Sequence, residues 1–269
     1  MELDGRYVLD LNNRYSCLLF DLDDTLYPLS LGIATACRDN IRDYMIERLG
    51  IDETKVPDLC FLLYKHYGTT MAGLRAIGYE FDYDDYHRFV HGRLPYDSLK
   101  RDPVLRTLLQ SLPIRKVSTL LDLHDGIICF ETVNPPASPS PSYDPINPAN
   151  IFDIVEHLSR PDSGADHLPE TPILCKPSED AMEQALKIAG INPRTAMFFD
   201  DSARNILAGK RIGLHTVLIG SSHRSAGADH ALESIHNIRE ALPELWEGAE
   251  RAEDVVHPAK VAIETTVRA

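Results

Sequence analysis

The chain has no long apolar run and little positive charge. None of its 269 residues lie in a stretch approaching the roughly 18 consecutive apolar residues of a membrane-spanning helix. The net charge of −14 argues against non-specific nucleic-acid binding, because contact with a phosphate backbone needs a basic face. Residues 1–6 lack the features of a secretory signal or a transit peptide. We therefore expect a cytoplasmic, or alternatively nuclear, protein with no membrane contact.

Clustered cysteines are also absent. The five cysteines are scattered and never form a C-x-x-C pair, so neither a disulfide framework nor a zinc site is expected. They are Cys17, Cys37, Cys60, Cys129 and Cys175.

The sequence does contain short apolar runs typical of buried parallel strands. Residues 15–20, 126–130, 196–199 and 216–220 have this pattern, and two of these runs end in clustered aspartates. Together with the helical segments between them, they predict an α/β fold with a Rossmann-like parallel sheet.

The domain organisation follows from composition and periodicity. Residues 1–29 and 100–247 are predicted to form the α/β core, and residues 30–99, with apolar positions at helical spacing, a small helical cap inserted after the first strand. Within the core, residues 132–172 are rich in proline and serine and predict a loop with one amphipathic stretch. Residues 248–269 are polar and unpatterned, which predicts a flexible tail.

Acidic residues follow the strands at the positions where a parallel sheet binds ligands. Asp21 and Asp23 come directly after the first run, and Asp200 after the run at 196–199. The carboxyl ends of parallel strands meet at one edge of the sheet, so these carboxylates are expected to converge. Carboxylates that repel one another need a compensating cation, and oxygen ligands favour a hard divalent ion, Mg²⁺.

The motifs resemble those of the haloacid dehalogenase-like hydrolase superfamily. The turn Asp21-Leu22-Asp23-Asp24-Thr25 is similar to its motif I (D-x-D-x-T), Lys176 to its motif III lysine, and Asp200-Asp201 to its motif IV. Within the superfamily, Leu26-Tyr27, the helical insert and residues 127–135 look like the pyrimidine 5′-nucleotidase-like branch of plants and fungi.

This resemblance implies a phosphatase and a role for each motif residue. Asp21 would be the nucleophile, Asp23 the general acid and base, and Lys176 the cation that offsets phosphate charge. Leu22, Asp23 and Lys176 would contact the substrate. Asp21, Asp23 through its carbonyl, Asp200 and Asp201 would hold Mg²⁺.

The phosphate-binding motif II of the superfamily is not recognisable. Ser118 and Thr119 follow a short apolar run, but only six residues separate them from Gly126. Parallel neighbours need a crossover of about a dozen residues, so a strand at 126–130 would prevent residues 117–119 from being a full parallel neighbour. The sequence looks as though a segment of about 20 residues, one βα unit, were missing. Thr119 is the candidate that would substitute in phosphate binding.

Three functions follow from these motifs. The first is a magnesium-dependent phosphomonoesterase acting on a small phosphorylated metabolite, a pyrimidine nucleoside 5′-monophosphate. The second is a catalytically impaired isoform that acts as a binding or regulatory protein, because motif II is missing. The third is a small sugar-phosphate phosphatase on the same core. The sequence does not define an oligomeric state.

Overall fold

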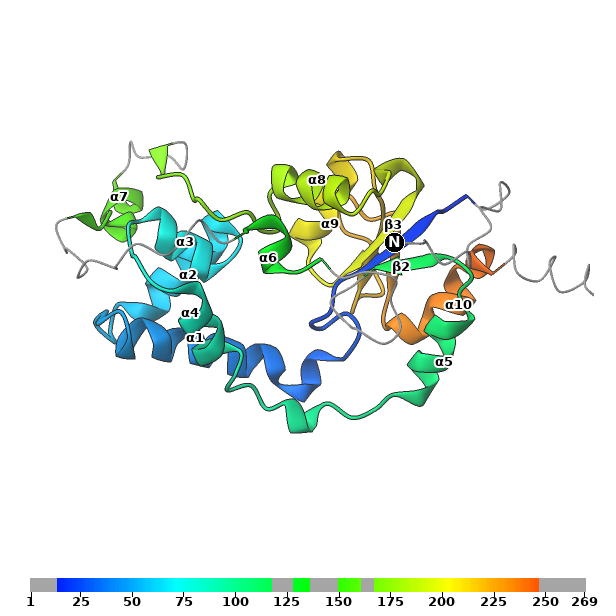
Figure 1. The fold of residues 1–269 in the computed structure, drawn as a ribbon, viewed down its shortest axis with the longest axis horizontal. Coiled ribbons are helices and arrows are strands. Elements are labelled where there is room, and N and C mark those ends of the chain that lie inside the picture. The colour runs from blue at the N-terminus through cyan, green and yellow to red at the C-terminus, as the bar shows by residue number, and fades with distance from the viewer. Residues whose placement is uncertain (1–13, 118–127, 136–149, 161–166, 247–269) are drawn as a thin grey trace, which may run out of the picture.

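The structure, a computed structural model, describes residues 14–117, 128–135, 150–160 and 167–246 (Figure 1). Its strands are β1 (Cys17–Phe20), β2 (Arg115–Val117), β3 (Ala196–Asp200), β4 (His215–Ile219) and β5 (His230–Leu232). Its α-helices are α1 (Ile33–Glu47), α2 (Val56–Tyr67), α3 (Thr70–Ala76), α4 (Tyr83–Val90), α5 (Pro103–Ser111), α6 (Phe130–Val133), α7 (Ile154–Ser159), α8 (Glu179–Ile188), α9 (Ala203–Arg211) and α10 (Ile238–Ala241). Short 3₁₀ helices lie at Leu29–Leu31, Tyr96–Ser98, Pro193–Thr195, Ile235–Asn237 and Pro243–Leu245.

The five strands form one sheet in the order β2-β1-β3-β4-β5, and every pairing is parallel. The predicted Rossmann-like α/β fold is confirmed. In register, Phe20 of β1 lies opposite Phe199 of β3, so the carboxyl ends of these two central strands finish side by side. Strand β5 was not predicted, because three residues are too few to show a pattern.

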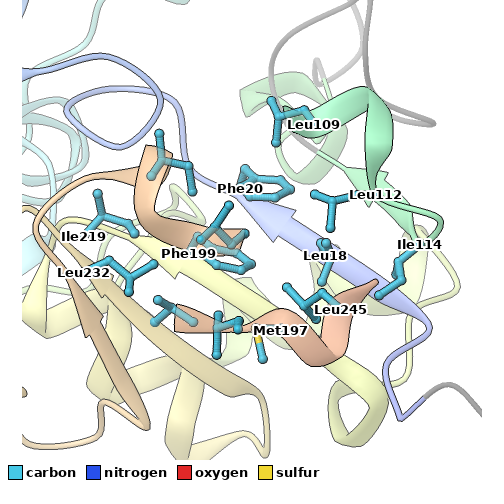
Figure 2. Close-up of a cluster of buried hydrophobic side chains, with 14 of the residues drawn as sticks. Leu18, Phe20, Leu109, Leu112, Ile114, Met197, Phe199, Ile219, Leu232 and Leu245 are labelled. Atoms are coloured by element: carbon cyan, nitrogen blue, oxygen red, sulfur yellow. The ribbon is translucent and has the colours of Figure 1, made fainter. Parts of the chain in front are cut away.

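Helices cover both faces of the sheet, which explains why the central strands β1 and β3 are apolar as far as Phe20 and Phe199. On one face Leu18, Phe20 and Phe199 pack with residues of α5, α10 and the C-terminal 3₁₀ turns, and the Phe20 and Phe199 rings are stacked with centroids 4.7 Å apart (Figure 2). On the other face Leu19 and Phe198 pack against α8 and α9. The alternation of side chains along each strand divides the core into these two layers.

Helices α1 to α4, which we call the helical unit, have a hydrophobic cluster of their own. Tyr44, Met45, Leu63 and Leu74 are almost fully buried within it, and Ile154 of α7 packs against the same cluster. In Figure 1 this unit lies to one side of the sheet. That residues 30–99 form a cap domain stays a prediction.

The predicted strand at 126–130 is wrong in its described part. Ile128 and Cys129 are irregular and Phe130 begins α6, while residues 126 and 127 lie outside the described residues. The Phe130 ring lies edge-on to Tyr83 and His87 of α4, so this side chain packs against the helical unit and is not part of a strand.

Because no strand is found at 128–130, the condition under which residues 117–119 could not be a full parallel neighbour is not met in the described residues. Strand β2 is a parallel neighbour of β1, with Leu19 opposite Val117. Residues 118 and 119, including the candidate Thr119, lie outside the described residues.

Two other predicted segments are described only in part. The tail at 248–269 lies outside the described residues, as do 136–149 and 161–166 of the proline- and serine-rich stretch. The described remainder of that stretch contains α7. Among the described residues, no helix has the length and hydropathy needed to cross a bilayer.

Candidate active site

Two aspartates meet at the carboxyl edge of the sheet. Asp200 is the last residue of β3, and Asp21 follows β1 directly. The backbone N–H of Asp21 donates to the carbonyl of Phe199 at 2.9 Å, so the β1–β3 ladder extends as far as this residue. The sheet therefore places both carboxylates at the same end of adjacent strands, as the sequence predicts.

The turn after Asp21 is built from local hydrogen bonds. The N–H of Leu26 donates to the carbonyl of Leu22 at 3.0 Å, and the buried Thr25 hydroxyl lies 3.4 Å from Asp21 Oδ2. Asp24 has a positive φ of 57°, a conformation that aspartate tolerates better than most residues. The side chain of Leu22 packs against the core, so any contact with substrate would fall to its backbone.

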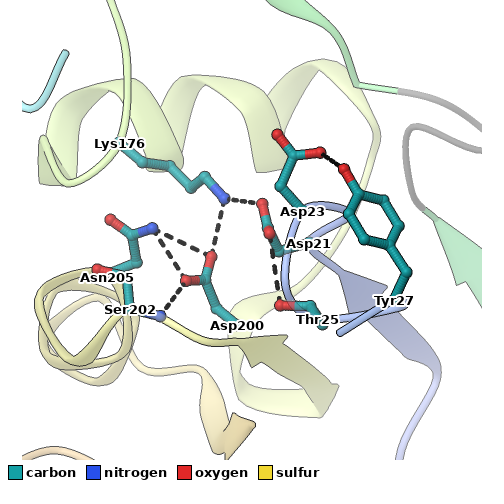
Figure 3. Close-up of polar contacts among 8 residues, drawn as sticks. All are labelled: Asp21, Asp23, Thr25, Tyr27, Lys176, Asp200, Ser202 and Asn205. Carbon is teal, nitrogen blue, oxygen red and sulfur yellow. Dashed lines mark hydrogen bonds and ion pairs between the residues drawn. The ribbon is translucent and has the colours of Figure 1, made fainter. Parts of the chain in front are cut away.

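Lys176 joins the two aspartates (Figure 3). Its ammonium nitrogen lies 2.5 Å from Asp21 Oδ1 and 2.8 Å from Asp200 Oδ2. Burial alone would lower the pKa of Lys176, but Asp200 and Asp21 raise it above its ordinary value, so the side chain stays charged. The residues predicted as nucleophile, phosphate-binding cation and metal ligand are thus in direct contact.

Asp200 is fully buried, and both of its carboxylate oxygens accept hydrogen bonds. The Ser202 N–H donates to Asp200 Oδ1 at 2.9 Å, and Asn205 Nδ2 lies 3.0 and 3.2 Å from the two carboxylate oxygens. Sequence reasoning missed Asn205. Its position could have indicated this contact, because Asn205 lies five residues after Asp200, in the first turn of α9. From there its side chain reaches back to the end of β3.

The carboxylates carry more negative charge than Lys176 neutralises. Burial raises the pKa of Asp200 above its ordinary value, and Lys176 offsets only part of this rise. Burial, then Asp200 and Asp21, raise the pKa of Asp201 to about 7. Burial, then Asp23 and Asp21, also raise the pKa of Asp24. The site therefore favours binding of a further cation.

Asp23 lies in the same turn, and its carboxylate makes a contact of its own. Its Oδ1 accepts a hydrogen bond from the Tyr27 hydroxyl, one helical turn along (Figure 3). Burial and this hydrogen bond raise the pKa of Tyr27, so it remains a donor. Tyr27 is a second site residue whose role sequence reasoning missed, although it lies beside the motif.

The donor set suits Mg²⁺, because it consists of carboxylate and carbonyl oxygens only. In the described part of the chain, no three His, Cys, Asp or Glu side chains are gathered closely enough to hold a metal as they stand. The Lys176 ammonium lies between Asp21 and Asp200. The buried Asp24 Oδ1 has no hydrogen-bond partner among the described residues, in line with the excess of acceptors over donors.

A cavity of about 330 Å³ adjoins the Asp21–Lys176 pair. Its walls are mostly apolar and come from the sheet and from α6 and α8, including Leu19, Phe130 and Met182. Apolar walls lower the effective dielectric constant beside the charged groups, which strengthens their interactions.

The parallel α/β sheet with two aspartates and a lysine at its carboxyl edge agrees with the resemblance of the sequence motifs to haloacid dehalogenase-like hydrolases. A family model described as HAD-hydrolase-like matches residues 173–247, the part that contains Lys176 and Asp200. Residues 173–247 of the chain are thus similar to this family of hydrolases.

One curated relative and two solved structures illustrate the similarity. "Phosphate metabolism protein 8" of Saccharomyces cerevisiae is 26% identical over 229 residues, which cover 81% of this chain and 65% of the yeast protein. The chain thus spans just under two thirds of that relative's length.

The structural likenesses are more distant. A HAD phosphatase from Thermococcus onnurineus has 15% identity and a TM-score of 0.48, covering 84% of this chain and 96% of the other. CbbY from Rhodobacter sphaeroides, in complex with phosphate, has 18% identity and a TM-score of 0.47, covering 86% and 99%. At these scores the likeness is no basis for assigning an activity.

Proposed function

We propose that the chain is a magnesium-dependent phosphomonoesterase that hydrolyses nucleoside 5′-monophosphates, pyrimidine nucleotides in particular, through an aspartyl-phosphate on Asp21. The contact of the Lys176 ammonium with both Asp21 and Asp200 carries this proposal. It brings a nucleophile, a phosphate-binding cation and a candidate metal ligand to one point. The pyrimidine preference rests on the resemblance of the sequence motifs alone.

The reaction runs in two displacements. A carboxylate oxygen of Asp21 attacks phosphorus, the bond to the ester oxygen breaks, and the departing alkoxide takes a proton from Asp23. Asp23 then removes a proton from water, which attacks the aspartyl-phosphate at phosphorus and releases Asp21 and inorganic phosphate. Lys176 offsets the negative charge of Asp21 and the phosphoryl group in both steps.

Tyr27 supports the role of Asp23. Its hydroxyl occupies Oδ1 of Asp23, which leaves Oδ2 to carry the proton that is exchanged. The hydrogen bond also limits the rotation of the carboxyl group, so the acid is held in one orientation.

Magnesium, when bound, would stabilise the charge that develops on the transferring phosphoryl group. We propose Asp21, the carbonyl of Asp23 and Asp200 as its ligands, with Asp201 as a further one. The raised pKa values of Asp200 and Asp201 support this assignment, because a divalent cation would let both acids ionise. Phosphate binding by Thr119 stays a prediction.

The test is release of phosphate from UMP and CMP, with and without Mg²⁺, compared with a panel of sugar phosphates. Asp21→Asn should lower turnover by more than about 10³-fold, because it removes the nucleophile. Asp39→Asn is the matched control: Asp39 is an exposed acid on α1 that forms an ion pair with Arg42. This control should retain wild-type turnover.

Each of the other outcomes identifies a different function. Turnover of sugar phosphates alone would replace the nucleotidase with a sugar-phosphate phosphatase. Thermal stabilisation by UMP without any hydrolysis would indicate the catalytically impaired binding protein. Folded protein that neither binds nor hydrolyses a phosphomonoester would contradict the proposal as a whole.

A further inference from the structure

The segment that carries Lys176 is packed into the helical unit before it reaches the sheet. Ile173 is 3% exposed and belongs to the hydrophobic cluster of α1 to α4, and Cys175 packs against the same cluster. The Thr171 hydroxyl donates to the carbonyl of Ala72 in α3 at 2.8 Å. Lys176 itself then contacts Asp21 and Asp200. The lysine therefore stands where the helical unit joins the core.

The turn between α2 and α3 presses directly on this segment. The Cys175 thiol donates to the carbonyl of Tyr67 at 3.4 Å and lies 3.8 Å from the Thr69 hydroxyl. Between these two residues, Gly68 has a φ of +85°. A Cβ atom there would lie 2.3 Å from the Lys176 carbonyl oxygen and 2.7 Å from Pro177 Cδ. Neither is the far end of a flexible side chain, so only a shift of the backbone could make room.

The core holds the end of α2 in place from the other side. Arg204 of α9 donates to the carbonyls of Tyr64 and Lys65, both at 3.2 Å, in the last turn of α2. Its guanidinium carbon lies 4.3 Å from the centroid of the Tyr64 ring. A cation at a helix C-terminus is favourable. The Tyr64 carbonyl also accepts from the Gly68 N–H at 3.1 Å, so Arg204 shares this acceptor with the turn itself.

We propose that the Tyr67-Gly68-Thr69 turn sets the position of Lys176, which makes Gly68 a positioning residue. Arg204 holds the end of α2, and with it this turn, against the core through its hydrogen bonds. The catalytic consequence of this proposal rests on the proposed function, whereas the placement of the lysine does not. Gly68 touches neither substrate nor reacting atoms. It acts by allowing the helical unit to lie against the Lys176 backbone at a distance no other residue permits.

Gly68→Ala and Gly50→Ala form a matched pair of variants. Gly50 also has a positive φ, +66°, and follows α1 in the same helical unit, but a Cβ there meets nothing within 4 Å. Both variants place an alanine at a positive φ. Only Gly68→Ala adds a collision with Lys176.

The kinetic readout separates positioning from general loss of structure. Gly68→Ala should lower kcat by about 10²-fold, the loss expected for a misplacement of about 1 Å, whereas Gly50→Ala should retain turnover. In a Lys176→Ala background, Gly68→Ala should cause no further loss, because the group it acts through is gone. An equal loss in both backgrounds would show that Gly68 does not act through Lys176.

A readout that needs no turnover is the reactivity of Lys176 toward an amine-acylating reagent. Mass spectrometry compares its labelling with that of the exposed Lys187 of α8 in the same digest. Gly68→Ala should raise relative labelling of Lys176 severalfold by releasing it from the two carboxylates, and Gly50→Ala should not. If the wild type hydrolyses no phosphomonoester, the proposed function fails while this arm still decides the positioning.

Arg204→Ala covers the case in which Gly68→Ala does not fold. Its control is Arg211→Ala: Arg211 is an exposed residue on α9 that forms an ion pair with Glu179 at 3.2 Å. Arg204→Ala should raise Lys176 labelling and lower kcat, and Arg211→Ala should change neither. Labelling of Lys176 that is the same in Gly68→Ala or Arg204→Ala as in the matched controls would overturn the proposal.

Discussion

Replacing Lys176 with methionine should destabilise the metal-free chain more than the loss of an ordinary ion pair. The side chain of Asp200 is 0% exposed and lies 2.8 Å from the Lys176 ammonium. At an effective dielectric constant of about 20, two charges 2.8 Å apart attract by roughly 6 kcal/mol before desolvation is counted. Removing one partner then leaves a buried carboxylate next to a second one.

The net loss is smaller than this attraction. Breaking a buried ion pair on one side costs about 3–5 kcal/mol. Because the Lys176 side chain is 38% exposed, solvent screens part of the interaction, and Ser202 and Asn205 still donate to Asp200. We expect Lys176→Met to lower the free energy of unfolding by about 2–3 kcal/mol.

The matched control is Lys210→Met. Lys210 lies 2.6 Å from Asp229, with side-chain exposures of 43% and 29%, so it makes a close ion pair whose acid is not buried. Its loss should cost at most about 1 kcal/mol. Urea unfolding at neutral pH without divalent cations measures both. Equal losses for the two variants would refute the view that Lys176 compensates a buried excess of negative charge.

Three further predictions test other contacts of the site. Asp201 has a pKa raised to about 7 in the folded chain, so its contribution to stability is present at low pH and lost as the pH rises through 7. In the metal-free chain, Asp201→Asn should have the wild-type free energy of unfolding at about pH 4 and a free energy about 1 kcal/mol higher at about pH 8. The gain is small because the side chain is partly exposed. A variant that is less stable than the wild type at the higher pH would contradict this. Tyr27→Phe should lower kcat about tenfold with KM unchanged, because Asp23 loses its orienting donor, and steady-state kinetics with unaltered kcat would exclude that role. Asn205→Ala should lower the free energy of unfolding by about 2 kcal/mol in urea, and an unchanged midpoint would show that its bonds to the buried Asp200 are dispensable.

The central strands and their acids could be predicted because their signals are local. The runs ending at Phe20 and Phe199 are apolar on both faces, and the rule that parallel strands present ligands at their carboxyl ends places Asp21 beside Asp200. These signals predict the parallel sheet, and the structure confirms it. The individual catalytic roles stay predictions.

Other features depend on contacts that a sequence pattern does not encode. Residues 128–130 have an apolar composition typical of a strand, but the partly buried Phe130 packs against α4 instead, and local composition does not distinguish the two. Asn205 and Gly68 look like ordinary helix and turn residues. Their importance comes from contacts with Asp200 and Lys176, which are brought near them only by the fold.

The most direct test of the central claim is to look for the covalent intermediate. The chain is mixed with UMP and Mg²⁺, quenched in acid within the first turnover, digested and examined by mass spectrometry. A phosphoryl group on the peptide that contains Asp21, absent from Asp21→Asn, is the predicted result. Phosphate release with no phosphorylated peptide, or with the phosphoryl group on another residue, would contradict the assignment of Asp21 as the nucleophile.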